Sequence, residues 1–540
     1  MEEPFLCTFT SDPSSRPHIS NVLKILSAEQ IREADAYTIK HEPIKSIDLM
    51  ERAASRCFDW IYERAPQLLS GLMTGESDWR FQVVCGKGNN GGDGLAIARM
   101  LMRSGYNVEV IVVHYSDKAS ADFKSNYDRL GAAAKKQVIN LKSEKDIPAF
   151  HLDALIVDAL FGSGISRPIE GFTAAVVEAI NASGAHVVSI DLPSGLPCDG
   201  AFRQKELAAV VADDVLSFQH PKMVFFLAEY AFWVGKVHIL DIGLHAEFIQ
   251  GLDTPRALLD RAMLAPLRHK RPRYSHKGSF GHALLIGGSP GKWGAIALAA
   301  KACMRSGAGL LTVQSGAAAA SGLLAHVPEA MHSLHPGEDY FKKPPVLDPY
   351  RCIGVGPGLS TEADCAAGLK LLIQEAKVPL VIDADALNIL AENKTWLAFL
   401  PKGSILTPHP GEWARLSGKR DVSHSEAIEA QLEMSAKHGI YIILKGAHSS
   451  LSDPAGRLWI NSTGNPGMAS AGTGDVLTGM LTGLLASGYS SLQAAMLGMY
   501  LHGAAGDLAL ENQSPESLMA TDLCESIGAA FKQLGYDKAD

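Results

Sequence analysis

Three groups of polar residues in the first half of the chain are of the types that hold a cation and move a proton. Asn90, Asp158 and Ser194 each lie in or next to a glycine-containing segment, and they offer oxygen atoms but no soft ligand. Such a set suits a hard cation of low charge density better than zinc. Asp191 remains as a carboxylate for acid–base chemistry. Because Asn, Asp, Ser and Gly also gather in turns for conformational reasons, it is the recurrence of three such segments that indicates a site.

A second arrangement of this kind lies near the C-terminal end, where AGTGD places Asp475 directly after Gly-Thr-Gly. The N–H groups of a glycine turn that enters a helix point the same way and bind anions. Phosphoryl transfer requires such an anion site, and the adjacent carboxylate can take the proton from an attacking hydroxyl group. We therefore predict that Asp475 is a general base beside a phosphate. The simpler alternative is an aspartate that only caps the helix, which is worth ~1 kcal/mol to the helix without any substrate.

The elements that must position these residues alternate between strands and helices in both halves of the chain. In the first half we expect strands at 81–85, 108–113, 154–160 and 186–192, and helices at 94–105 and 172–182, after a helical stretch that Ser27 caps. In the second half we expect a strand at 282–289, a helix at 294–309, and strands that run into polar loops at 352–360, 380–388, 404–412 and 441–449. Nearly continuous apolar strands indicate parallel sheets, which bind ligands at their carboxyl edge.

Length and composition narrow the class of protein. A chain of 540 residues suits two domains, and a net charge of −9 argues against general nucleic-acid binding. The eight cysteines form no CxxC pair, so we expect reduced thiols, mostly in the core, and a cytoplasmic protein. The 31 residues between Asp475 and Asp507 carry no formal charge, but their polar residues and the break at SGYSS favour two buried helices over a membrane span.

The alternation of strands and helices lapses near residues 250–260, and we place the domain boundary there. This gives a loose extension over 1–24, a first domain over 25–250 and a second domain over 256–540. A basic run from Arg268 to Lys277 follows the boundary. It either meets phosphates or is an exposed linker.

The first half resembles the NAD(P)H-hydrate epimerase domain in GKGNNGGDGLAIAR, VDALFGSG and SIDLPSGLPCDG, over about residues 25–243. The resemblance implies a Rossmann-like three-layer domain that interconverts the R and S hydrates of NADH and NADPH. It also implies that Asn90, Asp158 and Ser194 hold potassium and that Asp191 is the catalytic or substrate-orienting acid. Lys222 either lies near this site or is a solvated lysine. The residues implied to line the substrate are Asn89, Asn90, Gly91, Gly92, Asp93, Gly162, Ser163, Gly164, Ile165, Ser166, Arg167, Pro168 and Asp191.

The second half resembles the ribokinase-like superfamily, and more closely its NAD(P)H-hydrate dehydratase branch, in VIDADALN, LTPHPGE, LKGAHS and NPGMASAGTGDVLTG, over about residues 261–534. The resemblance implies that a nucleotide phosphorylates the hydroxyl of the S-hydrate and that phosphate then leaves, which restores NAD(P)H. Asp475 would contact the hydrate as the base, Ala295, Gly358 and His409 would line its pocket, and Glu412 would orient magnesium-bound water. The residues implied to bind the nucleotide are Lys445, Gly446, Ala447, His448, Ser449 and Gly474.

The two resemblances together predict a bifunctional enzyme that repairs hydrated NADH and NADPH. The implied cofactors are K⁺ in the first domain and Mg²⁺ in the second, with ADP as co-substrate by analogy with bacterial bifunctional enzymes. We expect no nucleic acid or membrane partner and a homo-oligomeric assembly. The alternative is a ribokinase-like vitamin or sugar kinase with a non-catalytic binding module in its first half, whose product would be a stable phosphate ester.

Overall fold

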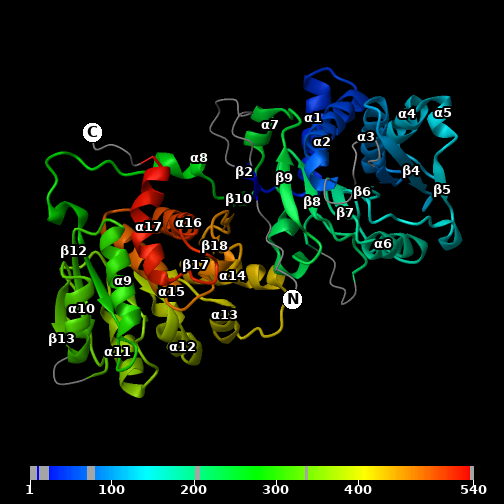
Figure 1. The fold of residues 1–540 in the computed structure, drawn as a ribbon. Coiled ribbons are helices and arrows are strands. Elements are labelled where there is room, and N and C mark those ends of the chain that lie inside the picture. The colour runs from blue at the N-terminus through cyan, green and yellow to red at the C-terminus, as the bar shows by residue number, and fades with distance from the viewer. Residues whose placement is uncertain (1–8, 11–22, 70–79, 201–206, 335–338, 536–540) are drawn as a thin grey trace. The chain divides into compact units, whose positions relative to one another are not determined.

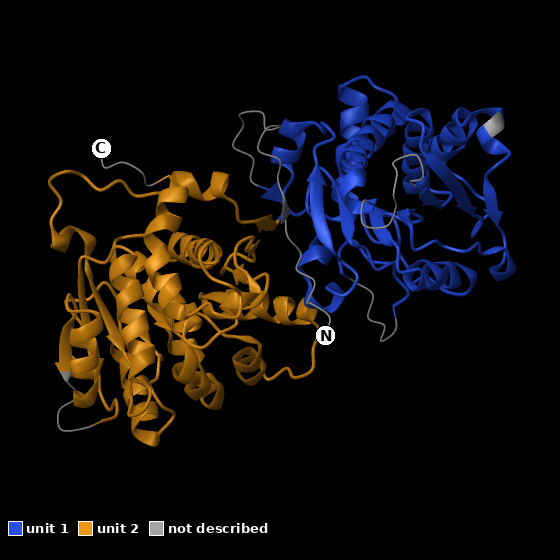
Figure 2. Ribbon diagram, viewed as in Figure 1, with its two compact units in different colours: residues 1–19, 23–254 blue, residues 20–22, 255–540 orange. Residues whose placement is uncertain are grey.

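The computed structural model describes residues 9–10, 23–69, 80–200, 207–334 and 339–535, which form two compact units (Figures 1 and 2). The first unit ends at Thr254 and the second begins at Pro255. Of the extension expected over 1–24, only residues 9–10 and 23–24 are described. Both pairs are short strands, β1 (Phe9–Thr10) and β2 (Leu23–Lys24).

The first unit is built on a parallel sheet. After β1 its strands are β3 (Arg80–Cys85), β4 (Asn107–Val113), β5 (Ile139–Leu141), β6 (Ala154–Ala159), β7 (His186–Ile190), β8 (Asp214–Phe218) and β9 (Lys236–Leu240). Their order is β1-β9-β8-β7-β6-β3-β4-β5. The chain order reverses between β3 and β6, as in Rossmann-like folds, and such a reversal is where doubly wound sheets bind ligands.

Helices cover both faces of this sheet. They are α1 (Ala28–His41), α2 (Ser46–Leu69), α3 (Asn89–Arg103), α4 (Ala121–Arg129), α5 (Gly131–Lys135), α6 (Phe172–Ala182) and α7 (Ala246–Gly251). Successive strand residues point to opposite faces. Val83 packs into one core with α2 and α3, and its neighbour Val84 packs into another with α6. The predicted three-layer Rossmann-like arrangement is therefore confirmed.

Two local predictions in this unit have different outcomes. Ser27 caps α1 as predicted, because its hydroxyl accepts a hydrogen bond from the Gln30 N–H while Gln30 reaches back to Ser27. The helix expected from residue 94 begins earlier, at Asn89. Its glycines Gly91 and Gly94 do not take a positive φ. Both are helical, and a Cβ on Gly91 would lie 1.8 Å from the Gly86 carbonyl oxygen, so these glycines serve close packing.

The second unit contains a mixed sheet. Its strands are β10 (Arg256–Leu258), β11 (His282–Ile286), β12 (Leu310–Ser315), β13 (Met331–Leu334), β14 (Cys352–Val355), β15 (Leu380–Ile382), β16 (Ile405–Leu406), β17 (Tyr441–Leu444), β18 (Ser450–Ser452) and β19 (Leu458–Ile460). Within residues 255–540 their order is β13-β12-β11-β14-β15-β16-β17-β18-β19-β10. The strands from β13 to β17 are parallel, and β18 is antiparallel to both its neighbours.

Helices again lie on both faces, which confirms the predicted α/β class of this domain. They are α8 (Arg261–Leu264), α9 (Trp293–Arg305), α10 (Ala320–His326), α11 (Ala363–Glu375), α12 (Ala384–Glu392), α13 (Pro410–Ser417), α14 (His424–His438), α15 (Thr473–Ala486), α16 (Ser491–Ala509) and α17 (Ala520–Gln533). One core joins the sheet to α9, α15, α16 and α17, and another joins it to α11, α12, α13 and α14.

The uncharged stretch after Asp475 forms α15 and α16, two buried helices as predicted. Helix α15 packs closely on α9 through two glycines one turn apart. A Cβ on Gly479 would lie 2.1 Å from the Ala299 carbonyl oxygen, and one on Gly483 would lie 2.4 Å from the Cys303 carbonyl oxygen. No helix in the described ranges is both long and apolar enough to cross a membrane.

Two candidate active sites

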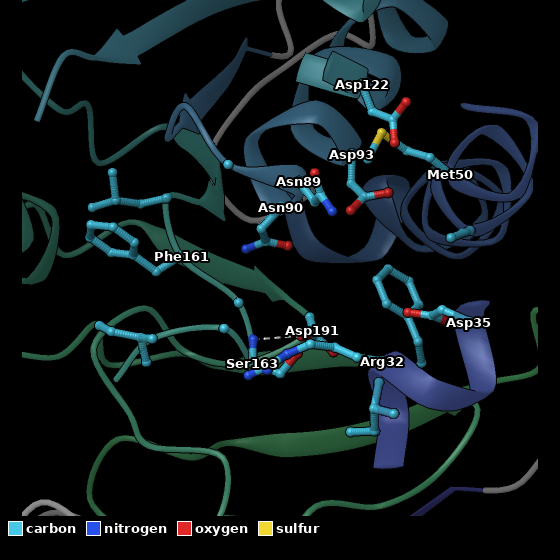
Figure 3. Close-up of a pocket in the computed structure, with 18 of the residues that line it drawn as sticks. Arg32, Asp35, Met50, Asn89, Asn90, Asp93, Asp122, Phe161, Ser163 and Asp191 are labelled. Atoms are coloured by element: carbon cyan, nitrogen blue, oxygen red, sulfur yellow. Dashed lines mark hydrogen bonds between the residues drawn. The ribbon is translucent and has the colours of Figure 1, made fainter. Parts of the chain in front are cut away.

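The first unit holds a cavity of about 950 Å³ at the carboxyl ends of its strands (Figure 3). On one side it is lined by the start of α3 and by the segments that follow β6 and β7. On the other side it is lined by α1 and α2, which contribute Arg32, Asp35 and Met50. The cavity therefore lies at the reversal of strand order, where the fold predicts a ligand.

Asp158, the fifth residue of β6, is fully buried at one side of this site. Its carboxylate accepts hydrogen bonds from Ser189 Oγ at 2.8 Å, from the Ser194 N–H at 2.9 Å and from Ser194 Oγ at 2.6 Å. Burial raises the pKa of Asp158, although these hydrogen bonds oppose the shift. The carboxylate is thus held by neutral donors.

Asn90 is buried in the first turn of α3, and neither its amide oxygen nor its amide nitrogen has a hydrogen-bond partner within the described part of the chain. Its side chain converges with that of Asp191 at Gly162. A Cβ built on Gly162 would lie 2.9 Å from Asp191 Oδ2 and 3.3 Å from the Asn90 side chain. Gly162 therefore leaves space between two polar groups, and a buried amide without a partner is costly unless a ligand satisfies it.

Asp191 follows β7 in the left-handed region, with φ of 69°, which is uncommon for a residue other than glycine. Its Oδ1 lies 2.7 Å from the ammonium of Lys222, and its Oδ2 accepts a hydrogen bond from the Ser163 N–H at 2.9 Å. Burial opposes ionisation, but Lys222 and the Ser163 hydrogen bonds together hold the pKa of Asp191 below its usual value. Lys222 is fully buried, so the alternative of a solvated lysine was wrong.

Further carboxyl groups line the cavity, among them Asp93 and Asp35. Asp93 of α3 is buried, and burial followed by the charges of Asp191, Asp35 and Asp122 raises its pKa well above the usual value. Burial and then Asp191 raise the pKa of Asp35 to about 6. Asp35 and Arg32 were missed by the sequence analysis, because only the packing of α1 over the sheet brings them to the cavity.

The structure brings most of the predicted substrate residues together. The cavity lining includes Asn89, Asn90, Asp93, Gly162, Ser163, Gly164, Ile165, Ser166, Arg167, Pro168 and Asp191. Gly91 and Gly92 are instead packed on neighbours, since a Cβ on Gly92 would lie 2.8 Å from the Met50 sulfur. Ser194 and Asp158 lie behind this lining and are joined to it by the Phe161 N–H, which donates to Ser194 Oγ at 2.8 Å.

The second site forms around the N-terminus of α15. Gly472 precedes the helix with φ of 93°, which only glycine adopts readily, and Asp475 is the third residue of the helix. Asp475 is therefore not the cap, which removes the simpler alternative. The first N–H groups of a helix have no intrahelical acceptor, so the first turn presents free donors and the positive end of the helix dipole.

An ion-pair network lies beside this helix end. Lys445, which follows β17, places its ammonium 2.9 Å from Asp383 Oδ1 and 3.9 Å from Glu412 Oε2. The other oxygen of Asp383 accepts a hydrogen bond from Thr478 Oγ1 at 2.7 Å. A Cβ built on Gly474 would lie 3.2 Å from Lys445 Nζ, so the ammonium points to the first turn of α15.

Two acids at this helix end, Asp475 and Glu412, have raised pKa values. Burial, and after it the charge of Asp383, raises the pKa of Asp475 to about 7, although Lys445 opposes the shift. Burial also raises the pKa of Glu412 to about 7. Burial disfavours the charged form of Lys445, but Asp383 and Glu412 outweigh it and raise its pKa. An acid that titrates near neutral pH suits general base catalysis.

The remaining predicted residues of the second unit fall into three places. Gly358 lies against Ala295, since a Cβ built on Gly358 would be 3.4 Å from the Cβ of Ala295. His409 caps α13 and lies beside Glu412, with its Nδ1 accepting from the Gly411 N–H at 3.0 Å. The nucleotide-binding residues predicted after β17 form a tight turn, in which the Gly446 N–H donates to Ser449 Oγ.

Comparisons with known proteins agree with this division. A family model described as NAD(P)H-hydrate dehydratase matches residues 283–528, and one described as YjeF-related protein N-terminus matches residues 46–224. The bifunctional NAD(P)H-hydrate repair enzyme of Moorella thermoacetica is 34% identical over 94% of this chain and 97% of its own length. Proteins of the same name from Thermofilum pendens and Leishmania braziliensis are 33% and 32% identical, over 97% and 92% of their lengths.

This chain belongs to the bifunctional NAD(P)H-hydrate repair enzymes. The predicted family is thus confirmed over both units. Among solved structures, an ADP/ATP-dependent NAD(P)H-hydrate dehydratase from Bacillus subtilis, co-crystallised with ATP and Mg²⁺, is 30% identical. It covers 51% of this chain and 98% of its own, with a TM-score of 0.46.

For this repair family, the main residue missed by the sequence analysis in the second unit is Asp383. It stands in the quoted motif VIDADALN, directly after β15, and is 1% exposed. Its position at the carboxyl edge of the sheet was a usable signal. Its pairing with Lys445, 62 residues further along the chain, was not visible in the sequence.

Proposed function

We propose that the first unit interconverts the R and S hydrates of NADH and NADPH, and that the second unit returns the S-hydrate to the reduced cofactor at the expense of a nucleotide phosphate. The observation that carries this proposal is the family relationship over almost the whole chain, combined with a separate acid-bearing site in each unit. Spontaneous hydration gives both epimers, so an epimerase supplies the one epimer that a stereospecific site can process.

In the first unit, epimerisation requires the hydroxyl group at the hydrated carbon to leave and to return on the other face. Asp191 is ionised beside Lys222 and lines the cavity, so we assign it the transfer of the proton. A positioned acid–base group contributes ~10²–10⁴ to the rate. The Lys222 ammonium and the Ser163 N–H hold the carboxylate in one orientation.

Potassium fits the residues that the sequence predicts for it. The Asn90 amide oxygen is buried without a partner, and the Asp158 carboxylate is fully buried among neutral donors. We therefore infer that Asn90, Asp158 and Ser194 hold a monovalent cation, which would supply positive charge beside the substrate. Asn90, Gly162 and Asp191 form the adjoining surface for the hydrate.

In the second unit, we assign Asp475 as the base that takes the proton from the hydroxyl group of the S-hydrate. The oxygen then attacks the terminal phosphorus of the nucleotide, and the bond from that phosphorus to the bridging oxygen breaks, which releases the nucleotide one phosphate shorter. The phosphorylated hydrate then loses inorganic phosphate together with the proton on the adjacent ring carbon, which restores the double bond of the reduced ring. The first turn of α15 and the Lys445 ammonium bind the transferred group. Ala295, Gly358 and His409 are assigned to the hydrate, and residues 445–449 with Gly474 to the nucleotide.

Magnesium also fits this site. Glu412 is buried and its pKa is raised to about 7, so a divalent cation nearby would favour its ionised form. When bound, Mg²⁺ would neutralise charge on the nucleotide phosphates. We infer ADP as the donor, as predicted from the bacterial relatives, with ATP as the competing donor. The homo-oligomeric assembly and the cytoplasmic location stay predictions.

The proposal is tested by recovery of reduced-nicotinamide absorbance from mixed R- and S-hydrates with ADP, Mg²⁺ and K⁺. We expect full recovery with the intact chain, and only the S fraction promptly with Asp191→Asn. Asp475→Asn should lower the rate ~10²–10⁴-fold, the contribution of a general base. Parallel reactions with ATP identify the donor, and reactions in Na⁺ test potassium.

Two outcomes would contradict this assignment. A stable phosphate ester as the final product would indicate an ordinary small-molecule kinase. Normal repair by Asp475→Asn would show that another group removes the proton. Lys222→Met serves as a control in the first unit, because it should slow epimerisation while dehydration of pure S-hydrate proceeds at the wild-type rate.

A further inference from the structure

Asp383 has no role as a helix cap, although it occupies the capping position of α12. Aspartate at this position usually accepts a hydrogen bond from the first turn of the helix. The Asp383 side chain makes no such bond, and the next residue, Ala384, takes a positive φ of 49°. The Asp383 side chain is 1% exposed and does not cap the helix. Because a buried carboxylate is costly unless other groups pair with it, its partners must lie elsewhere in the site.

The two oxygens of Asp383 connect two parts of the site. Oδ1 pairs with the Lys445 ammonium at 2.9 Å, and Oδ2 accepts from Thr478 Oγ1 at 2.7 Å. Thr478 is fully buried and lies one turn after Gly474 on α15. The carboxylate therefore fixes the distance between the end of β17, which carries Lys445, and the first turns of α15.

Lys445 and the N-terminus of α15 are both positive, and they lie side by side. Lys445 Nζ would be 3.2 Å from a Cβ on Gly474, and Asp383 Oδ2 would be 3.6 Å from it. The lysine ammonium and the positive end of the helix dipole repel each other at this distance, and a nearby anion offsets that repulsion. The Asp383 carboxylate supplies this negative charge from within the protein. The N–H groups of α15 therefore stay available for a phosphate.

Resting on the function proposed above, we propose that Asp383 is a positioning residue of the second site, which holds the Lys445 ammonium at the N-terminal end of α15 for the nucleotide phosphate. Its carboxylate acts through Lys445 and not on the reacting atoms. Replacing it by a neutral side chain frees the ammonium to turn away and weakens nucleotide binding.

A second consequence concerns Asp475, which faces several charged groups. Burial and then Asp383 raise the pKa of Asp475, Asp385 and Glu412 raise it further, and Lys445 lowers it. Asp385 is itself paired with Lys292 at 3.0 Å. On α16, burial lowers the pKa of His502 to about 4, so this histidine is neutral near pH 7. Removing the charge of Asp383 therefore shifts the ionisation of Asp475 to lower pH.

The test compares Asp383→Asn with the intact full-length chain. Titration calorimetry with ADP and with ATP measures nucleotide binding without turnover. Steady-state kinetics on S-hydrate from pH 5.5 to 9 measures the pH dependence of the rate and the KM for the hydrate. We expect nucleotide affinity to fall ~10-fold or more, as for the loss of a charge-assisted hydrogen bond. We also expect the acid limb of the rate profile to move to lower pH, with a smaller change in KM for the hydrate.

Asp453→Asn is the matched control. Asp453 is 1% exposed and paired with Arg457 at 2.7 Å, but it follows β18. Because Ile442 pairs with Ser452 in the antiparallel register, Asp453 lies at the amino end of β17, opposite to Lys445. This variant should lower the melting temperature and leave the nucleotide affinity and the pH profile unchanged. A purely structural role for Asp383 would give the same result in Asp383→Asn, and that would overturn the inference.

Thr478→Val gives a second route if Asp383→Asn does not fold. It removes one hydrogen bond to Asp383 at a buried position with nearly the same side-chain volume, and it should weaken nucleotide binding ~3-fold or more. Unchanged affinity in this variant would also count against the inference. If the wild-type chain binds nucleotide but fails to repair the hydrate, the proposed function fails, and the positioning of Lys445 is still decided by calorimetry.

Discussion

At the scale of single residues, Asp191 and Asp475 show how the same side chain is tuned in opposite directions. Both are aspartates, and both lie near a lysine. The Lys222 ammonium pairs directly with Asp191 and holds the pKa of that acid low. Lys445 is engaged by Asp383, so burial and the like charge of Asp383 dominate and raise the pKa of Asp475 to about 7. The direction of the shift therefore depends on whether the lysine pairs with the acid itself, as Lys222 does, or with another acid, as Lys445 does.

This difference predicts the pH dependence of dehydration. If Asp475 is the base, its ionised form is active, so kcat/KM for the S-hydrate should fall ~tenfold per pH unit below pH 7 and level off above it. Epimerisation should keep its rate to lower pH, because the pKa of Asp191 is lowered. Initial rates of the two steps between pH 5 and 9 provide the check, and parallel profiles would refute the assignment.

The same shift has a consequence for stability. The folded-state pKa of Asp475 lies above its unfolded value, so its contribution to stability is complete below about pH 4 and is lost as the pH rises through about 7. The Asp475→Asn variant should therefore dehydrate S-hydrate ~10²–10⁴-fold more slowly yet be more stable than the wild type at pH 8, by roughly 1–2 kcal/mol. The gain should disappear near pH 4, and urea unfolding at both pH values measures it.

At the scale of elements, close packing of helices fixes the second site. Helix α15 carries Asp475 on its first turn, and its position is set further along, where Gly479 and Gly483 lie on the backbone of α9. Helix α9 begins near Ala295, which lies against Gly358. The contact between the two helices therefore sets the spacing between the proposed base and the proposed hydrate pocket.

Gly479→Ala should be strongly destabilising. The new methyl group would lie 2.1 Å from the Ala299 carbonyl oxygen, so the helices must separate, and overpacking of this kind costs ~1–3 kcal/mol or more. Gly528→Ala on α17 is the control. It meets no atom within 4 Å and has an ordinary helical backbone, so it should stabilise by ~0.4–1 kcal/mol. Thermal unfolding of the two variants distinguishes them, and equal melting temperatures would contradict the packing argument.

At the scale of the whole molecule, the two units have separate cores. The two large hydrophobic clusters of the first sheet use residues up to Leu240, and those of the second sheet begin at Ala257. Each sheet also has its own reversal of strand order, between β3 and β6 and between β11 and β14. The chain thus repeats one principle of construction twice, with different chemistry at the carboxyl edge of each sheet.

Residues 1–254 and 255–540 should therefore fold when produced as separate chains. We expect the second chain to dehydrate S-hydrate alone and the mixture of both to repair R-hydrate as well. Circular dichroism reports folding, and nicotinamide absorbance reports repair. Loss of dehydration in the isolated second chain, despite a folded spectrum, would show that its site needs the first unit.

The amino-acid sequence alone was enough to predict the two α/β units, the central strands of each sheet, and the segments that carry chemistry. Those features are local, because apolar runs, glycine turns and caps such as Ser27 act over a few residues. It did not show that Lys222 is buried on Asp191, that Lys445 pairs with Asp383, or that α1 brings Asp35 to the cavity.

These partners, and with them the charge state of each acid, depend on the three-dimensional packing of the chain. The pKa of a carboxyl group depends on its burial and on charges within a few ångströms, and those charges come from segments far apart in the chain. The roles of the glycines differ for the same reason. Gly472 needs its positive φ, whereas Gly91 and Gly479 are needed because another segment's carbonyl oxygen occupies the space of a side chain.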